Sequence, residues 1–232
     1  VNKMPEFQSD SERALFAQGV IGSVFKRVYY NSVTEVPTSA CVFPDQLVVN
    51  STAKDLERAE RISYEFIVSE DRFQELVDEG LFVDHGEDPY DIELAPFQEK
   101  INSLLGISQT QYDVGYQIVE QHINLILPSP FGDPEERYRP YIVYVDKKSS
   151  KVLGVYKNWD EEDTKFKRRD HFVHYPFIVG FGFYGYGYAH LLGNIQVTLT
   201  AVMRSLVDSG QFANMQGGFK LKNFKVVDNS PI

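Results

Sequence analysis

The sequence predicts an α+β fold, in which helices come first, an antiparallel β meander follows, and a long apolar helix lies near the end. Three observations predict it. Before residue 107, helix-capping residues precede segments with apolar residues at helical spacing. Between residues 112 and 179, runs of β-branched and aromatic residues are separated by turns rich in Gly, Pro and charged residues. After Tyr188, apolar residues recur every three or four positions.

The chain is expected to open with a helix. Ser9, Asp10 and Ser11 are good N-cap residues, and Gly19 and Gly22 weaken the helix by about 1 kcal/mol each relative to alanine. The apolar side chains that follow at helical spacing are Leu15, Phe16, Val20, Ile21, Val24, Phe25 and Val28. From Val28 to Val49, β-branched and aromatic residues broken by prolines predict strands and turns.

A second helix is predicted over Ala53–Ile62. Ser51 or Thr52 would cap it, and Thr52 with Asp55 forms a weak version of the capping box. The stretch Ile62–Val68 then predicts an extended segment, because it is rich in β-branched and aromatic residues.

The third helix has the clearest limits. Ser69 is the expected N-cap of Glu70–Glu79, and Gly80 is the expected C-terminal stop. A shorter helix is predicted to begin at Pro96, which suits a first helical turn, and to end before Gly106.

The meander is predicted as four strands. Gly115–Leu127 is a long strand whose apolar alternation changes phase near His122, as a β-bulge would cause. Tyr141–Val145 and Lys151–Tyr156 flank a polar turn and predict a hairpin, and His171–Val179 is the last strand of the meander.

Composition excludes several classes of protein. The 232 residues include 23 Lys and Arg against 33 Asp and Glu, a net charge of −10, with 43% hydrophobic residues. Intrinsic disorder needs lower hydrophobicity, and a basic nucleic-acid-binding domain needs a much higher isoelectric point than 5.0. The single cysteine, Cys41, excludes a disulfide framework and a cysteine-based zinc site. No secretory signal is visible at the first residues.

The most informative segment is His171–Met203, which has no Asp, Glu, Lys or Arg. It is long enough for a membrane span, but its five glycines, Pro176 and strand-like half would leave backbone groups unpaired in lipid. Burial between protein subunits explains the missing charges better. We therefore expect a subunit interface at Tyr186, Tyr188, Leu191, Leu192, Ile195, Leu199, Val202, Met203 and Leu206.

An alternative function is nucleotide binding by an enzyme, because Gly180–Gly185 matches the G-x-G-x-x-G pattern between a strand and a helix. Against it, the variable positions are Phe and Tyr, and Asp208 falls at a helix end instead of a strand end. His171 and His174 lie three apart on a strand, so they do not form a zinc pair. We expect no catalytic residues, no metal and no cofactor.

Four stretches of the sequence resemble the portal proteins of tailed bacteriophages, in the branch of long portals. They are Phe25–Tyr30, Leu47–Ala59, His171–Tyr175, and Gly182–Gly187 continued by Leu206–Lys220. The last is the specific one, since the others alone would be weak, and the likeness covers most of the chain.

The resemblance implies a non-enzymatic subunit of a homo-oligomeric ring, usually of twelve copies, at one capsid vertex of the virion. Residues 1–185 would form a wing-like α+β domain, 186–210 the first stem helix, and 211–232 the start of a clip segment, so the sequence is expected to end within a domain. The ring would pass double-stranded DNA without sequence-specific contacts. Its implied partners are the terminase large subunit, capsid and scaffolding proteins, and a tail adaptor. It would assemble in the host cytoplasm, with no membrane.

Overall fold

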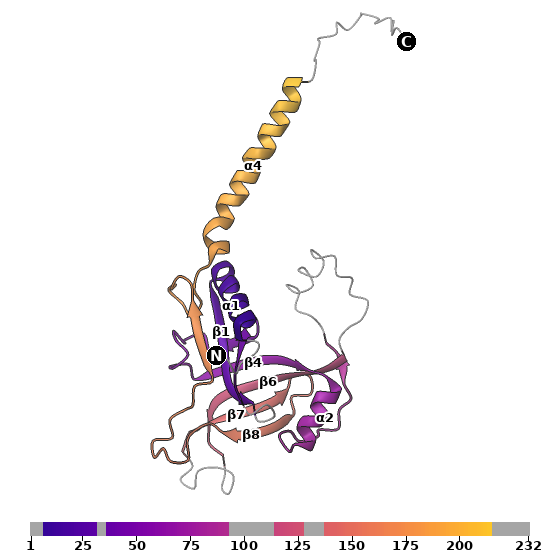
Figure 1. The fold of residues 1–232 in the computed structure, drawn as a ribbon, viewed down its shortest axis with the longest axis vertical. Coiled ribbons are helices and arrows are strands. Elements are labelled where there is room, and N and C mark those ends of the chain that lie inside the picture. The colour runs from indigo at the N-terminus through magenta and orange to yellow at the C-terminus, as the bar shows by residue number, and fades with distance from the viewer. Residues whose placement is uncertain (1–6, 32–35, 93–113, 128–136, 215–232) are drawn as a thin grey trace, which may run out of the picture. The chain divides into compact units, whose positions relative to one another are not determined.

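A computed structural model describes residues 7–31, 36–92, 114–127 and 137–214. The described strands form two antiparallel sheets, and the fold is α+β as predicted (Figure 1). The chain divides into two compact units between Gly187 and Tyr188. The predicted helix from Pro96 and the predicted strand-like stretch 219–227 lie outside the described residues.

The smaller sheet has three strands in the order β2-β1-β9. Its strands come from both ends of the first unit: β1 (Ser23–Asn31), β2 (Val36–Val42) and β9 (Phe172–Pro176). The central strand β1 pairs antiparallel with both neighbours. Residues more than 140 positions apart in the sequence therefore lie side by side in this sheet.

Helix α1 spans Phe7–Ile21 and packs on this sheet. The prediction that the helix continues to Val28 was wrong, because Gly22 adopts a left-handed conformation (φ +98°) that ends the helix, and the chain then enters β1. Its small residues Ala14 and Ala17 face the core, whereas Leu15 and Phe16 are 67% and 76% exposed. Close packing of the helix on the sheet accounts for the small residues on the inner face.

The larger sheet has the order β3-β4-β6-β7-β8, and all its pairs are antiparallel. Its strands are β3 (Leu47–Val49), β4 (Arg61–Val68), β6 (Val114–Leu125), β7 (Arg139–Asp146) and β8 (Val152–Lys157), with the short β5 (Tyr90–Asp91) pairing at the end of β6. The predicted hairpin is confirmed as β7 and β8, and the predicted extended stretch Ile62–Val68 as part of β4.

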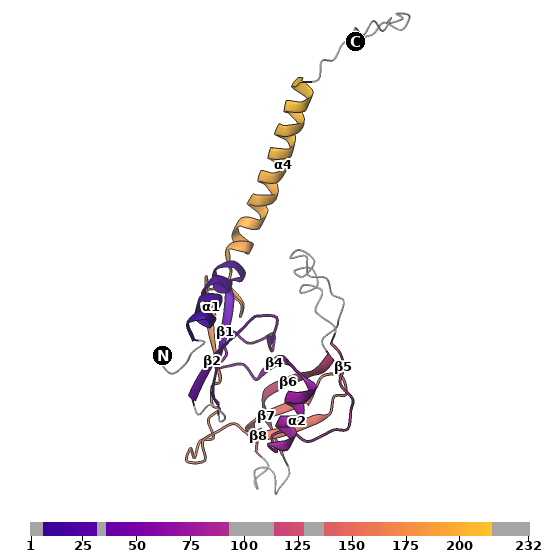
Figure 2. The ribbon, with the colours of Figure 1, turned by 45° about the vertical axis from the view of Figure 1, so that its right-hand side comes forward.

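Helix α2 spans Glu70–Asp78 and covers one end of this sheet (Figure 2). Its predicted limits are confirmed. The Ser69 side chain accepts a hydrogen bond from the Arg72 amide, and Gly80 follows with φ +72°. Phe73 anchors the helix, since its ring lies 4.3 Å from that of Tyr116 in β6.

The predicted helix over Ala53–Ile62 was wrong. Residues 51–58 form turns and bends, and β4 begins at Arg61. The Arg168 guanidinium donates hydrogen bonds to the carbonyls of Leu56 and Ala59, at 2.6 Å and 2.7 Å. A helix would direct these carbonyls along its axis, so a distant arginine stabilises the turns instead.

The predicted bulge near His122 was also wrong. Strand β6 pairs in continuous register with both neighbours on either side of His122. The irregularity lies between Tyr144 and Val145, where β7 pairs with β8. The apparent change of phase arises because the second half of β6 carries apolar residues on the opposite face of the sheet.

The second unit contains helix α4, Tyr188–Asn214, which runs past the predicted end at Gly210. At 1.5 Å per residue, its 27 residues give a helix about 40 Å long. None of its residues is buried. The first unit, by contrast, has a continuous core around Phe25, Leu47 and Phe172 and a second core around Phe73, Ile118 and Leu153.

Candidate functional site: the glycine junction and helix α4

The segment that leads into α4 folds back on the turn between α1 and β1. The Phe177 amide donates to the Gly22 carbonyl at 2.9 Å. A Cβ added to Gly185 would lie 2.5 Å from the Gly22 oxygen, and one added to Gly187 would lie 2.5 Å from the Gly22 nitrogen. Only glycine allows the two backbones to approach this closely. We call this contact of residues 22, 185 and 187 the glycine junction.

Ser23 fixes the junction from within. Its side chain is buried, and its Oγ accepts a hydrogen bond from the Gly185 amide at 2.7 Å. The same Oγ lies 3.0 Å from Nε2 of His174 in β9. Burial lowers the pKa of His174, so its imidazole is neutral near pH 7. The hydroxyl therefore joins the loop to the sheet without a buried charge.

Aromatic rings cover the junction. The rings of His174, Phe25 and Phe183 pack together in a triangle, with centroids 4.6 Å, 4.9 Å and 5.7 Å apart. The Tyr184 hydroxyl donates to the Leu47 carbonyl at 3.1 Å. Each of the four stretches that resemble portal proteins contributes at least one of these residues, so stretches far apart in the sequence meet at one place.

The same geometry limits the nucleotide-binding alternative. The Gly185 amide already donates to Ser23, and a Cβ on Gly180 would meet the Tyr186 ring at 2.8 Å. Gly182 has open space around it, and the neighbouring Phe181 is fully exposed. Gly180 and Gly185 of this loop thus allow close packing of the chain. Fewer backbone amides are therefore available to bind a phosphate.

The predicted interface residues fall on one element with one exception. Tyr186 precedes the helix and forms a single bridge with Ile178, while the other eight lie in α4. All nine are between 41% and 65% exposed. The structure therefore brings the α4 residues together along one helix and leaves their apolar side chains accessible.

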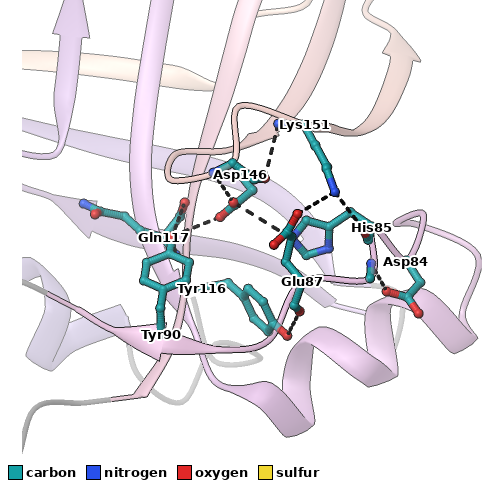
Figure 3. A network of polar contacts seen from close by, with 10 residues as sticks. Asp84, His85, Glu87, Tyr90, Tyr116, Gln117, Asp146 and Lys151 are labelled. Carbon is teal, nitrogen blue, oxygen red and sulfur yellow. Dashed lines mark hydrogen bonds and ion pairs between the residues drawn. The ribbon is translucent and has the colours of Figure 1, made fainter.

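A second polar cluster lies at the turn between β7 and β8 (Figure 3). The buried Asp146 carboxylate accepts hydrogen bonds from the Tyr90 hydroxyl at 2.9 Å and the Ser149 amide at 2.7 Å. Burial alone would raise the pKa of Asp146, but these hydrogen bonds and nearby His85 outweigh it and lower the pKa. Lys151 pairs with Glu87 at the rim, which ties the segment before β5 to the turn.

The Tyr90→Phe variant is expected to lose about 1–3 kcal/mol of unfolding free energy, because the hydroxyl also accepts from the Gln117 amide at 2.8 Å. The loss should be larger at neutral pH than below the pKa of Asp146, where the carboxylate is protonated. Urea unfolding at pH 7 and at successively lower pH values measures it. Tyr30→Phe is the control, since Tyr30 is largely exposed, and equal stability of the two variants would contradict the role of Tyr90.

Two classes of site receive no support from the described ranges. Among these residues, no three His, Cys, Asp or Glu side chains are grouped so that they could hold a metal ion. In the same part of the chain, no helix combines the length and hydrophobicity needed to span a bilayer. Cys41 is half-buried, and burial together with Asp10 raises the pKa of its thiol.

Comparison with known proteins identifies no family for this chain. No family model matches the sequence, and no curated protein matches it either. The function is therefore inferred from the residues themselves, above all from α4 and from the stretches that meet at the glycine junction.

Proposed function

We propose that this chain is a subunit of a phage portal, a non-enzymatic ring at one vertex of the capsid. Residues 1–185 would be its wing, the helix within 186–210 its first stem helix, and residues from 211 the start of its clip. The ring passes double-stranded DNA during packaging and ejection. It also docks the terminase large subunit, capsid and scaffolding proteins, and a tail adaptor.

One observation supports assembly most directly. Apolar residues follow α4 at alternating spacings of three and four, which is the pattern of helices that pack side by side. We call this set the apolar stripe: Leu192, Ile195, Leu199, Val202 and Leu206. Each of its members is more than half exposed. Arg204 and Asp208 are the only Asp, Glu, Lys or Arg residues in the whole helix.

The exposed stripe is energetically costly in water. Complete burial of a large aliphatic side chain contributes about 1.5–3 kcal/mol, so half-exposed side chains can each gain roughly 1 kcal/mol when a neighbour covers them. Five such residues, with Leu191 and Met203 beside them, give several kcal/mol per helix. Copies of α4 arranged around an axis would cover the stripes of their neighbours.

The charge of the chain suits a DNA conduit. Many Lys and Arg contacts to phosphates would bind DNA tightly in a salt-dependent way and slow its movement. A chain with a net charge of −10 avoids such contacts. This supports passage of DNA and not its retention.

Imaging of the complete subunit tests the proposal. Purified protein at micromolar concentration is expected to form ring-shaped particles with a central channel in electron micrographs, and native mass spectrometry should give a single large multiple of the subunit mass. Particles of monomer mass alone, under conditions in which the subunit is folded, would exclude the ring.

A further inference from the structure

A buried row of polar side chains joins the two sheets of the first unit. It begins with Arg27 in β1, whose Nη2 donates to Glu120 Oε2 in β6 at 2.6 Å. The other carboxylate oxygen, Oε1, lies 2.8 Å from Nε2 of His122. Glu120 and His122 are each 1% exposed. The carboxylate therefore binds a cation of the small sheet and an imidazole of the large sheet at once.

The partners fix the direction of every hydrogen bond in the row. An ionised Glu120 only accepts, so His122 carries its proton on Nε2 and its Nδ1 is an acceptor. The Asn158 amide nitrogen, 3.3 Å away, donates to that Nδ1. The Asn158 oxygen then accepts from Nε2 of His171 at 3.1 Å, directly before β9. Asn158 thus joins the two imidazoles, donating to His122 and accepting from His171.

The other groups that face the row do not supply a compensating charge. Tyr64 in β4 and Tyr144 in β7 flank Glu120, and burial raises the pKa of both hydroxyls. The Arg27 guanidinium lies over the rings of Tyr64 and Tyr29. The ionised members at neutral pH are therefore Arg27 and Glu120, one positive and one negative.

We propose that this row is a pH-sensitive latch between the two sheets, closed while His171 is neutral and released when His171 takes up a proton. The proposal goes beyond the proposed function. A proton on His171 adds a positive charge to a partly buried site in which the charge of Arg27 opposes it.

The fold lowers the pKa of both His171 and Glu120. Burial is the main cause that lowers the pKa of His171. His122 and Arg27 lower it further, whereas Glu120 and a hydrogen bond to the Val28 backbone oppose the shift. Burial would raise the pKa of Glu120, but the hydrogen bond from His122 and the charge of Arg27 outweigh it and lower the pKa. Both groups bind protons more readily in the unfolded chain. Their stabilisation is thus complete above the ordinary histidine pKa of about 6.5 and declines as the pH falls.

Release of the latch would act on the glycine junction. Strand β1 carries Arg27 and begins one residue after Gly22, and β9 follows His171 and carries His174. The pairing of β1 with β9 is therefore the element expected to open, while α2 and the centre of the large sheet stay protected.

Hydrogen exchange measured against pH tests the latch. After correction for the intrinsic pH dependence, exchange of the β9 amides is expected to rise several-fold more than that of α2 between pH 7.5 and 5.5. His171→Gln keeps a donor toward Asn158 but cannot be protonated, so the rise should be largely lost. A full rise in His171→Gln would overturn the proposal.

Two further variants separate the latch from a merely structural role. Asn158→Asp keeps the shape of Asn158 but offers only acceptors to the imidazoles, so opening should move to lower pH. His174 is a second imidazole in β9 whose pKa burial lowers, so His174→Gln is the comparison: the rise should fall less in His174→Gln than in His171→Gln. If His174→Gln abolishes the rise instead, or Asn158→Asp moves opening to higher pH, the proposal fails.

Discussion

The Gly187→Ala variant is expected to destabilise the first unit strongly, although it adds a single methyl group. The new Cβ would lie 2.5 Å from the Gly22 nitrogen and 2.7 Å from the Ile21 carbonyl carbon. Both are backbone atoms and cannot rotate away. Overpacking of a core costs about 1–3 kcal/mol when side chains can adjust, and we expect a loss at or above the upper limit here. That is a large part of a typical total stability of about 5–15 kcal/mol.

Gly182→Ala is the matched control. Gly182 belongs to the same loop but has no atom within 4 Å of the added Cβ, so its change should stay within about 0.5 kcal/mol. Urea unfolding followed by the fluorescence of Trp159, the only tryptophan, compares the two variants. Similar midpoints for Gly187→Ala and the parent protein would show that the backbones separate easily and that the junction is not tight.

Local signals predicted the elements whose causes are local. Helix α2 was predicted from Ser69 and Gly80, which cap it directly. The hairpin of β7 and β8 was predicted from alternation on both sides of a short polar turn. These features depend on residues only a few positions apart, so short sequence patterns are sufficient to predict them.

Elements set by distant residues were predicted wrongly. The apolar residues after Thr52 have helical spacing, but the carbonyls of this segment accept hydrogen bonds from Arg168 instead of from a following helical turn. Val24 and Phe25 continue the helical pattern of α1, yet they lie in β1, where they pair with Tyr175 and His174 of the distant strand β9. A partner more than 100 residues away does not change the local spacing of apolar residues, so this spacing cannot predict it.

The candidate site was predicted only in part. The apolar residues of α4 were found because their spacing and the missing charges are visible in the sequence. The glycine junction was not, because Gly22 was interpreted as a weak helix position and not as a contact of Gly187. The row from Arg27 to His171 was also missed. Its members come from four separate segments, and two histidines 49 positions apart give no recognisable motif.

The Leu199→Asp variant is expected to abolish ring formation while the first unit stays folded. Leu199 is at the centre of the apolar stripe and 61% exposed, so no core of the described chain depends on it. In a ring, a neighbour would cover it, and an unpaired carboxylate buried there costs several kcal/mol at every contact around the axis. Native mass spectrometry and electron microscopy of the complete subunit should detect only small species, with the circular dichroism spectrum unchanged.

Ala201→Asp gives the decisive comparison. Two positions along a helix differ by about 200°, so residue 201 faces away from the stripe. Replacement by Asp lowers the helix propensity at position 201, as it does at position 199. If neighbouring copies pack through the stripe, Ala201→Asp retains rings at concentrations where Leu199→Asp loses them. If both variants assemble equally, the stripe is not the contact between subunits. If Leu199→Asp unfolds the first unit as well, the two units depend on each other and the independence assumed for α4 is wrong.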